Sequence, residues 1–175
     1  MKIELKTLDE IDPYQLAHQA NNPYIGQYLR NSFPYPYTLD HAMKFISFSL
    51  QHQSLDFAIV VDNQCVGCVG VTFHKDIYLK NCEIGYWLGY DYWNLGIMNK
   101  VIAMLCPYLF ENFTITKICA EVFAENQASA HILEKNSFEK EGYLKKHVYK
   151  NGKYYDLILY GLRKESYENK KISII

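Results

Sequence analysis

The stretch that decides the fold reads EIGYWLG over residues 83–89 and YWNLGIMN over residues 92–99. Its first part has the character of a strand, and helical periodicity starts after Gly96. N–H groups at the start of a helix lack intrahelical partners, and the helix dipole favours negative charge there. Because Gly96 lets the backbone approach a ligand closely, the turn predicts an anion-binding site. An ordinary loop between a strand and a helix is the alternative interpretation.

Outward from this stretch, short or alternating apolar runs predict several strands. Turn residues at Asp62-Asn63 and Asn151-Gly152 predict that the strands flanking each pair form hairpins. The strands are expected over residues 3–8, 57–61, 65–73, 82–88, 117–123, 144–150 and 154–162. Helices alternate with these strands, so the pattern predicts an α+β fold whose sheet is mainly antiparallel.

Four helices are expected, each with a local signal at its start or end. Asp12-Pro13 opens the first, which stops before Pro23, and Thr38 caps the second, over residues 39–51. The third follows Gly96 and should bend at Pro107; the fourth spans residues 128–135. The apolar positions predict a buried face of Leu39, Ala42 or Met43, Ile46 and Leu50 in the second helix, and of Ile97, Val101, Met104, Leu105, Tyr108 and Leu109 in the third.

Length and composition indicate one ordinary domain, which we expect over residues 1–165, with residues 166–175 as a frayed tail. Charged residues make up 21% and the net charge is −1, which argues against a general nucleic-acid binder. No run approaches the roughly 20 apolar residues that span a bilayer. Charges also interrupt the apolar runs at the start, so no signal peptide and no membrane association are expected. We therefore expect a cytoplasmic protein.

The five cysteines are an odd number scattered through apolar segments, a pattern typical of reduced thiols in a core. Cys65 and Cys68 form a lone CxxC without a second pair, and the six histidines show no metal-ligand spacing. In a regular strand their thiols would point to opposite faces of the sheet. The sequence therefore predicts no metal site.

Several ordered blocks resemble the GNAT superfamily of N-acetyltransferases, and within it the RimJ/RimL-like branch. The decisive stretch is similar to the acetyl-CoA loop of that branch. Further blocks follow in the same order, and together they cover nearly the whole chain. They are NNP at 21–23, FPYPYT at 33–38, ENQAS at 125–129, LEKNSF at 133–138 and NGKYYD at 151–156.

The resemblance implies a central sheet splayed between the strands at residues 82–88 and 117–123, with acetyl-CoA in the splay and no metal. The pantetheine would pair with backbone near Leu88, and the pyrophosphate would lie on N–H groups of the loop. Asn126 would bond the pantetheine amide, and Ser129 would lie near the sulfur. The implied acetyl-CoA site consists of Trp87, Leu88, Gly89, Asn94, Leu95, Gly96, Ile97, Met98, Asn99, Asn126 and Ser129.

Some positions depart from the family pattern. The loop commonly starts with Gln or Arg followed by Gly, whereas this chain has Trp93 and Asn94. Met98 replaces a small residue, so a bulkier loop is expected. Ser137 stands where Gly is usual, in a left-handed position at a helix end, where Ser is mildly strained.

Amide formation needs an oxyanion donor, a route for the amine proton and a donor to the departing sulfur. A backbone N–H near Leu88 is the oxyanion candidate. Ser129 is the candidate donor to sulfur, with a helix-capping serine as the alternative. The family often has Tyr where this chain has Leu133, which favours Ser129. Glu83 is the first candidate base, against a solvated edge charge, and His147 is the second.

The acceptor side is expected at the loop held extended by Pro34 and Pro36, with Phe33, Tyr35 and Tyr37 as substrate-binding residues. We expect transfer from acetyl-CoA to a primary amine, on a protein N-terminus or a small molecule, by direct attack in a ternary complex. A non-catalytic acyl-CoA-binding module is the alternative. A nucleotide-binding domain is disfavoured because no GKS or GKT loop is present. The protein is expected to be a monomer or a homodimer.

Overall fold

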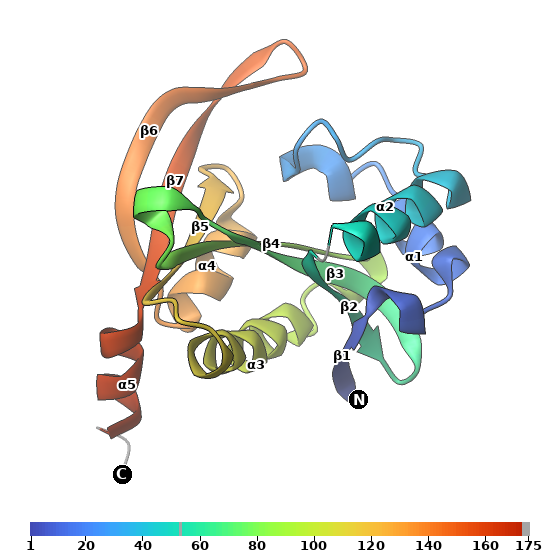
Figure 1. Ribbon diagram of the computed structural model, residues 1–175. Coiled ribbons are helices and arrows are strands. Elements are labelled where there is room, and N and C mark those ends of the chain that lie inside the picture. Colours follow the sequence, from blue (N-terminus) through green and yellow to red (C-terminus); the bar gives the residue numbers. More distant parts are fainter. Residues whose placement is uncertain (53, 173–175) are drawn as a thin grey trace. The chain divides into compact units, whose positions relative to one another are not determined.

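A computed structural model describes residues 1–52 and 54–172, with side chains up to residue 169. Its seven strands form one sheet in the order β1-β2-β3-β4-β5-β7-β6 (Figure 1). The predicted α+β class is confirmed. The strands are β1 (Ile3–Thr7), β2 (Leu55–Val61), β3 (Gln64–Phe73), β4 (Asn81–Leu88), β5 (Lys117–Phe123), β6 (Glu139–Lys150) and β7 (Lys153–Arg163).

The helices begin and end close to the predicted positions. Short 3-10 turns occupy Leu8–Glu10, Ile25–Tyr28, Asp76–Tyr78 and Tyr90–Tyr92. The α-helices are α1 (Pro13–Ala20), α2 (Leu39–Gln51), α3 (Ile97–Asn112), α4 (Gln127–Lys135) and α5 (Lys164–Ile172).

The chain divides into two compact units. The first consists of Met1–Val71 with Gly85–Val101, and the second consists of Thr72–Ile84 with Ile102–Ile175.

In the first unit, β1, β2 and β3 are antiparallel neighbours. Asp62 and Asn63 both have positive φ, of 46° and 70°, as a tight hairpin turn requires. The predicted caps are present, because the Asp12 carboxylate accepts from the Tyr14 N–H at 2.9 Å and the Thr38 hydroxyl accepts from the His41 N–H at 3.4 Å. Local sequence therefore sets where these elements begin.

The predicted buried face of α2 is wrong at its C-terminal end. Leu50 is 48% exposed, whereas Ser49 is 2% exposed. The Ser49 hydroxyl is buried at low cost because it donates to the Asp56 carboxylate on β2, with an oxygen–oxygen distance of 2.7 Å. Met43 is also exposed, so Ala42 is the buried member of that predicted pair.

Burial raises the pKa of Asp56, and the hydrogen bond from Ser49 opposes that rise. A carboxyl group with a raised pKa contributes stability that is complete below its ordinary value of 3.8. That contribution is lost as the pH climbs through the folded-state pKa. We expect the free energy of unfolding of the wild type, relative to Asp56→Asn, to fall as the pH rises from 3.8 through the raised pKa of Asp56 in the folded protein. Urea unfolding between pH 4 and pH 8 measures it, and matching pH profiles of the two proteins contradict it.

Both thiols of the CxxC lie on one face of the sheet, contrary to the prediction. Cys65 pairs with Val60 of β2, and Cys68 pairs with Ala58, which lies two residues before Val60 and on the same face. A β-bulge between Ile59 and Val60 causes this, because Val66 is an extra residue in β3 and reverses the alternation. Both thiols join the same buried core cluster, and burial raises the pKa of Cys65 to about 11.

In the second unit, β5 pairs with β7 and β7 with β6, all antiparallel. The hairpin turn Asn151-Gly152 has positive φ at both residues, 52° and 78°, as predicted. Strands β4 and β5 are parallel, with Asn81–Glu83 aligned to Lys117–Cys119 at the start of each strand. The pairs β1–β2, β2–β3, β5–β7 and β6–β7 are antiparallel, so the sheet is mainly antiparallel, as the sequence predicted.

Helix α3 buries Ile97, Val101, Leu105 and Leu109 of the predicted face, but the other two predicted residues are exposed. Met104 and Tyr108 are 43% and 41% exposed. The buried positions are Ile97, Met98, Val101, Ile102, Leu105, Cys106, Leu109 and Phe110. They recur in adjacent pairs every four residues, so the buried face is rotated toward residues 102, 106 and 110. Pro107 lies inside the helix, which continues to Asn112.

The segment expected to fray forms α5 as far as Ile172, and residues 173–175 lie outside the described residues. Lys164 donates from Nζ to the Phe110 carbonyl at 2.8 Å. The Tyr167 ring lies 5.6 Å from the Phe110 ring, measured between centroids. These contacts attach the start of α5 to the end of α3.

Candidate functional site

The loop between β4 and α3 has the backbone geometry of an anion site. Asn94 and Gly96 both have positive φ, 59° and 72°, so successive N–H groups can converge on one point. At the start of the following helix, the Lys100 N–H donates to the Gly96 carbonyl at 3.3 Å. Ile97 and Met98 stand in the first turn of α3, where N–H groups generally lack an intrahelical acceptor. The helix dipole adds positive potential at this end.

Side chains at the start of α3 hold this loop without filling it. Ile97 and Met98 are 1% and 5% exposed, so Met98 packs inward and does not add the bulk that the sequence suggested. Apart from Gly96 and its two chain neighbours, no atom of the described residues lies within 4 Å of the position that a Cβ on Gly96 would take. The loop therefore leaves open space at the residue where a close approach was predicted.

The peptide between Leu88 and Gly89 is held from both ends. The Gly89 N–H donates to the Val66 carbonyl at 2.7 Å, and the Trp93 indole N–H donates to the Leu88 carbonyl at 2.7 Å. The Gly89 N–H is therefore committed to Val66, and a backbone N–H near Leu88 stays the predicted oxyanion donor. Val66 is the extra residue of the β3 bulge, so the bulge aims its carbonyl at this peptide.

The two hydrogen bonds that hold the Leu88–Gly89 peptide were not predicted from the sequence, although Gly67 was a signal for the one to Val66. A Cβ on Gly67 would meet the Trp87 carbonyl oxygen and would lie 3.0 Å from the Leu88 Cα. A glycine inside a strand indicates a bulge or a close backbone approach, and Gly67 marks both. The role of the Trp93 indole had no comparable signal.

The three predicted acceptor-side rings lie in different environments. The Phe33 centroid lies 4.9 Å from that of Tyr37 and 5.6 Å from that of Trp87. Tyr37 is 6% exposed and belongs to the core cluster, and burial raises its pKa to about 12. Its N–H donates to the Asn21 side chain at 3.0 Å. Tyr35, by contrast, is 61% exposed, so it is the ring that faces solvent.

In the second unit, Asn126 caps α4. Its side-chain oxygen accepts from the Ser129 N–H at 3.2 Å. Asn126 therefore takes the capping role that was the alternative for Ser129, and Ser129 contributes its backbone to that cap. Leu133 is fully buried. Ser137 has the predicted left-handed φ, 71°, and the Phe138 N–H donates to the Leu133 carbonyl at 3.0 Å to end the helix.

The two candidate bases differ in setting. Glu83 is half-buried on β4, where its register partner is Cys119 on β5. His147 is exposed in a three-residue irregularity of β6, between Leu144 and Val148. Asp156 fixes this irregularity by accepting from the Tyr143 hydroxyl at 2.6 Å and from the Lys146 N–H at 2.7 Å.

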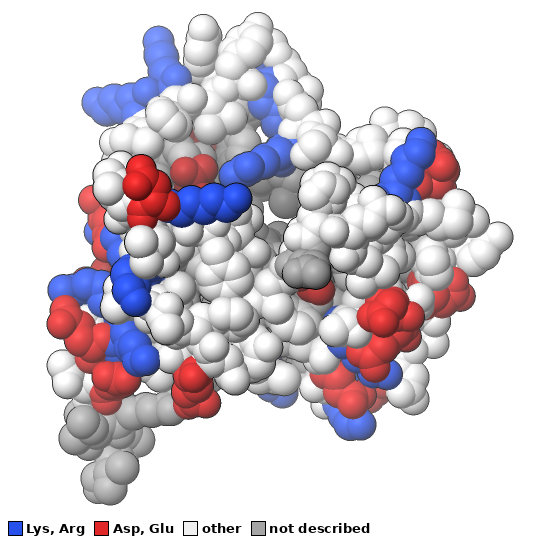
Figure 2. Space-filling view, viewed as in Figure 1, with Lys and Arg blue, Asp and Glu red and all other residues white. Residues whose placement is uncertain are grey.

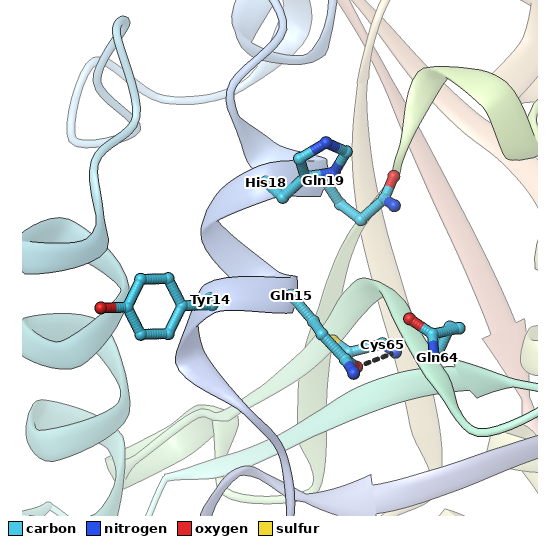
Figure 3. A pocket seen from close by; sticks show the side chains of 6 residues that line it. All are labelled: Tyr14, Gln15, His18, Gln19, Gln64 and Cys65. Carbon is cyan, nitrogen blue, oxygen red and sulfur yellow. Dashed lines mark hydrogen bonds between the residues drawn. The ribbon is translucent and has the colours of Figure 1, made fainter.

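A surface hollow of about 320 Å³ lies beside α1, and none of the predicted site residues lines it. Gln15, His18, Gln19, Gln64 and Cys65 line it together with Tyr14, whose ring points away from β3 (Figure 3). Gln15 spans it by accepting from the Cys65 N–H at 2.8 Å. Gln19 connects this hollow to the loop after β4, because its side chain lies where a Cβ on Gly89 would be.

Among the residues that the structure describes, no three metal-ligating side chains cluster.

A family model described as the acetyltransferase (GNAT) domain matches residues 2–139. The chain therefore belongs to the GNAT acetyltransferase family. Membership places it among the acetyl-CoA-dependent N-acetyltransferases, as the resemblance implied.

The relatives agree with this assignment. The uncharacterized N-acetyltransferase YokL of Bacillus subtilis, encoded by the SPbeta prophage, is 31% identical over 80% of each chain. The uncharacterized N-acetyltransferase YoaA of Bacillus subtilis is 36% identical over 49% of this chain, a match that spans 48% of that relative. Spermidine N-acetyltransferase from Vibrio cholerae, solved with CoA and spermine, is 22% identical with a TM-score of 0.80, over 95% of this chain and 98% of that one. At this identity the last likeness shows a shared fold.

Proposed function

We propose that this protein transfers the acetyl group of acetyl-CoA to a primary amine, on a protein N-terminus or a small molecule, by direct attack in a ternary complex. The loop from Asn94 to Asn99 carries the proposal, because its left-handed turns and helix start suit a pyrophosphate. The pantetheine pairs with backbone at Trp87, Leu88 and Gly89, and Asn126 bonds its amide.

The reaction needs a balanced transfer of one acyl group and one proton. The neutral amine nitrogen attacks the thioester carbonyl carbon, the C–N bond forms, and the carbonyl oxygen gains negative charge. A backbone N–H near Leu88 stabilises that charge. The carbonyl re-forms as the C–S bond breaks, the Ser129 hydroxyl supplies a proton to the sulfur, and the nitrogen loses its proton to Glu83, directly or through water. Glu83 then releases its proton to solvent, and a proton from solvent restores the Ser129 hydroxyl.

Turnover separates this proposal from the non-catalytic alternative. Release of free CoA thiol from acetyl-CoA is measured with a panel of peptides, polyamines and aminoglycosides, and binding is measured in parallel by thermal shift. Thiol release that depends on an amine supports the enzyme. A thermal shift without turnover on any class of amine supports an acyl-CoA-binding module. Absence of both contradicts the proposed site.

For the acceptor, we propose one reactive amine on an apolar or peptide-like body. The exposed Tyr35 ring offers an apolar face with a phenolic tip. Residues 33–39 carry no carboxylate, which a polycationic substrate would prefer. A peptide-like acceptor agrees with the RimJ/RimL-like motifs of the sequence. We propose that the chain belongs to that branch, and this proposal rests on the motif residues alone. Clear preference for spermidine over peptides contradicts this acceptor class.

Replacing Tyr35 tests the acceptor side directly. We expect Tyr35→Ala to raise the acceptor KM about tenfold, the scale of one lost aromatic contact, without changing acetyl-CoA affinity. Tyr14→Ala is the matched control, because Tyr14 is 68% exposed on α1. If both variants leave KM unchanged, or if Tyr35→Ala loses only stability, Tyr35 packs the loop and binds no acceptor.

The cytoplasm remains our proposed compartment. The five cysteines are free thiols, and four of them are buried. None of the described helices is long and apolar enough to cross a membrane. Acidic and basic side chains stand beside one another over much of the charged surface in Figure 2, in line with a net charge of −1.

A further inference from the structure

Trp93 occupies an unusual position, because it contacts the end of β4 and an aromatic series at once. Its indole N–H holds the Leu88 carbonyl at 2.7 Å, while its ring is 39% exposed. The Gly89 N–H on the same peptide is bound to Val66 at 2.7 Å. Both polar groups of this peptide are therefore satisfied in fixed directions, which orients the backbone next to Leu88.

The Trp93 ring continues a short ladder of rings within the first unit. Its centroid lies 4.9 Å from that of Tyr90. Tyr90 in turn stacks on Tyr24 at 5.4 Å, with 29° between the ring planes. All three rings are partly exposed, and aromatic pairs at these distances attract one another beyond their buried area.

Tyr24 belongs to the connection between α1 and α2, which also carries the proposed acceptor loop. Its N–H donates to the Asn22 side chain at 3.0 Å. The Ile25 N–H donates to the Asn22 carbonyl at 3.1 Å, and the Leu29 N–H donates to the Gly26 carbonyl at 3.2 Å. Each of these hydrogen bonds joins residues two or three apart. Exchange of their amide hydrogens needs only local opening, so the exchange rate reports the local stability of this segment.

We propose that Trp93 is a positioning residue that fixes the Leu88 peptide for acetyl-CoA and transmits occupancy of the loop, through Tyr90, to the turn at Tyr24. This rests on the proposed function, because acetyl-CoA must bind the loop that contains Trp93. A ligand on that loop restricts the Trp93 ring, which restricts Tyr90 and then Tyr24. The donor site thereby stabilises the segment that leads to the acceptor side.

Hydrogen–deuterium exchange with CoA as the probe tests the ladder. In the wild type we expect CoA to slow exchange in peptides covering both residues 94–99 and residues 24–29, the latter about fivefold, at the low end of coupling between sites. In Tyr90→Leu, and in Tyr24→Leu, only residues 94–99 should be slowed. Tyr14→Leu replaces an exposed tyrosine outside the ladder and should behave as the wild type.

Trp93→Phe tests the indole N–H separately, because it keeps a ring for Tyr90. We expect the acetyl-CoA Kd to rise about fivefold, as one net hydrogen bond predicts, while residues 24–29 are still slowed once the variant is saturated. An unchanged Kd overturns the positioning role.

The other outcomes are equally decisive. Slowing of residues 24–29 that persists in both ladder variants overturns the transmission, and so does a wild type in which only residues 94–99 respond. If CoA stabilises the wild type but slows neither segment, the proposed acetyl-CoA loop is itself wrong. That result is distinguishable from failure of the ladder alone.

Discussion

Acetyl-CoA should not stabilise the Gly96→Glu variant, whereas it should clearly stabilise the wild type. At 100 times Kd, binding adds about 2.7 kcal/mol to the free energy of unfolding, which is roughly 5–11 °C in Tm for a chain of this length. The space beside Gly96 is open, so a glutamate side chain would enter it and bring a negative charge to the proposed pyrophosphate site. We expect at least a hundredfold weaker binding, on the order of 2.7 kcal/mol.

The matched control is Gly152→Glu. Gly152 also has positive φ, 78°, and open space at its Cβ position, but it lies in the β6–β7 hairpin turn. Both substitutions therefore impose similar backbone strain, and only the one at residue 96 meets the proposed ligand. Equal thermal shifts in Gly96→Glu and the wild type contradict the assignment of the loop. Loss of the shift in both variants indicates a general effect of strain.

Local signals explain how much of the fold could be predicted. Asp12 and Thr38 begin their helices because each side chain accepts from an N–H of the first turn. Asn151-Gly152 forms a hairpin because both residues tolerate positive φ. The interactions at these three places join residues at most three apart, so the sequence itself contains them.

Buried faces were predicted less well because they depend on distant partners. Ser49 is buried through its bond to Asp56, which is on another element. Helix α3 is apolar on nearly every side, so its periodicity could not choose between Tyr108 and Phe110. Gly67 signals a bulge or a close approach in β3, but the register of β2 and β3 is needed to locate the extra residue at Val66, which puts Cys65 on the face of Cys68.

The candidate site divides in the same way. The turn at Gly96 could be predicted, since a single glycine before a helix has a backbone consequence. The bond from Trp93 to Leu88 could not, because it requires the loop to fold back over the strand that it follows. The roles of Ser129 and Glu83 depend on a reacting substrate and therefore remain predictions.

Ser129→Ala should lower kcat at least tenfold, roughly 1.4 kcal/mol in the activation free energy, without weakening acetyl-CoA binding. A donor to the departing sulfur acts mainly in the transition state, so its loss affects kcat and not affinity. Single-turnover acetylation of the best amine measures the step, and Ser129→Thr, which keeps a hydroxyl, should recover part of the rate.

Stability measurements separate this role from a structural one. Asn126 provides the cap of α4 by accepting from the Ser129 N–H, and alanine at residue 129 retains that N–H. Asn126→Ala should therefore lose about 1 kcal/mol of stability, as lost caps do, whereas Ser129→Ala should keep this cap. If Ser129→Ala instead unfolds more easily while kcat per folded molecule stays the same, the hydroxyl supports the fold and the proton reaches the sulfur from another group.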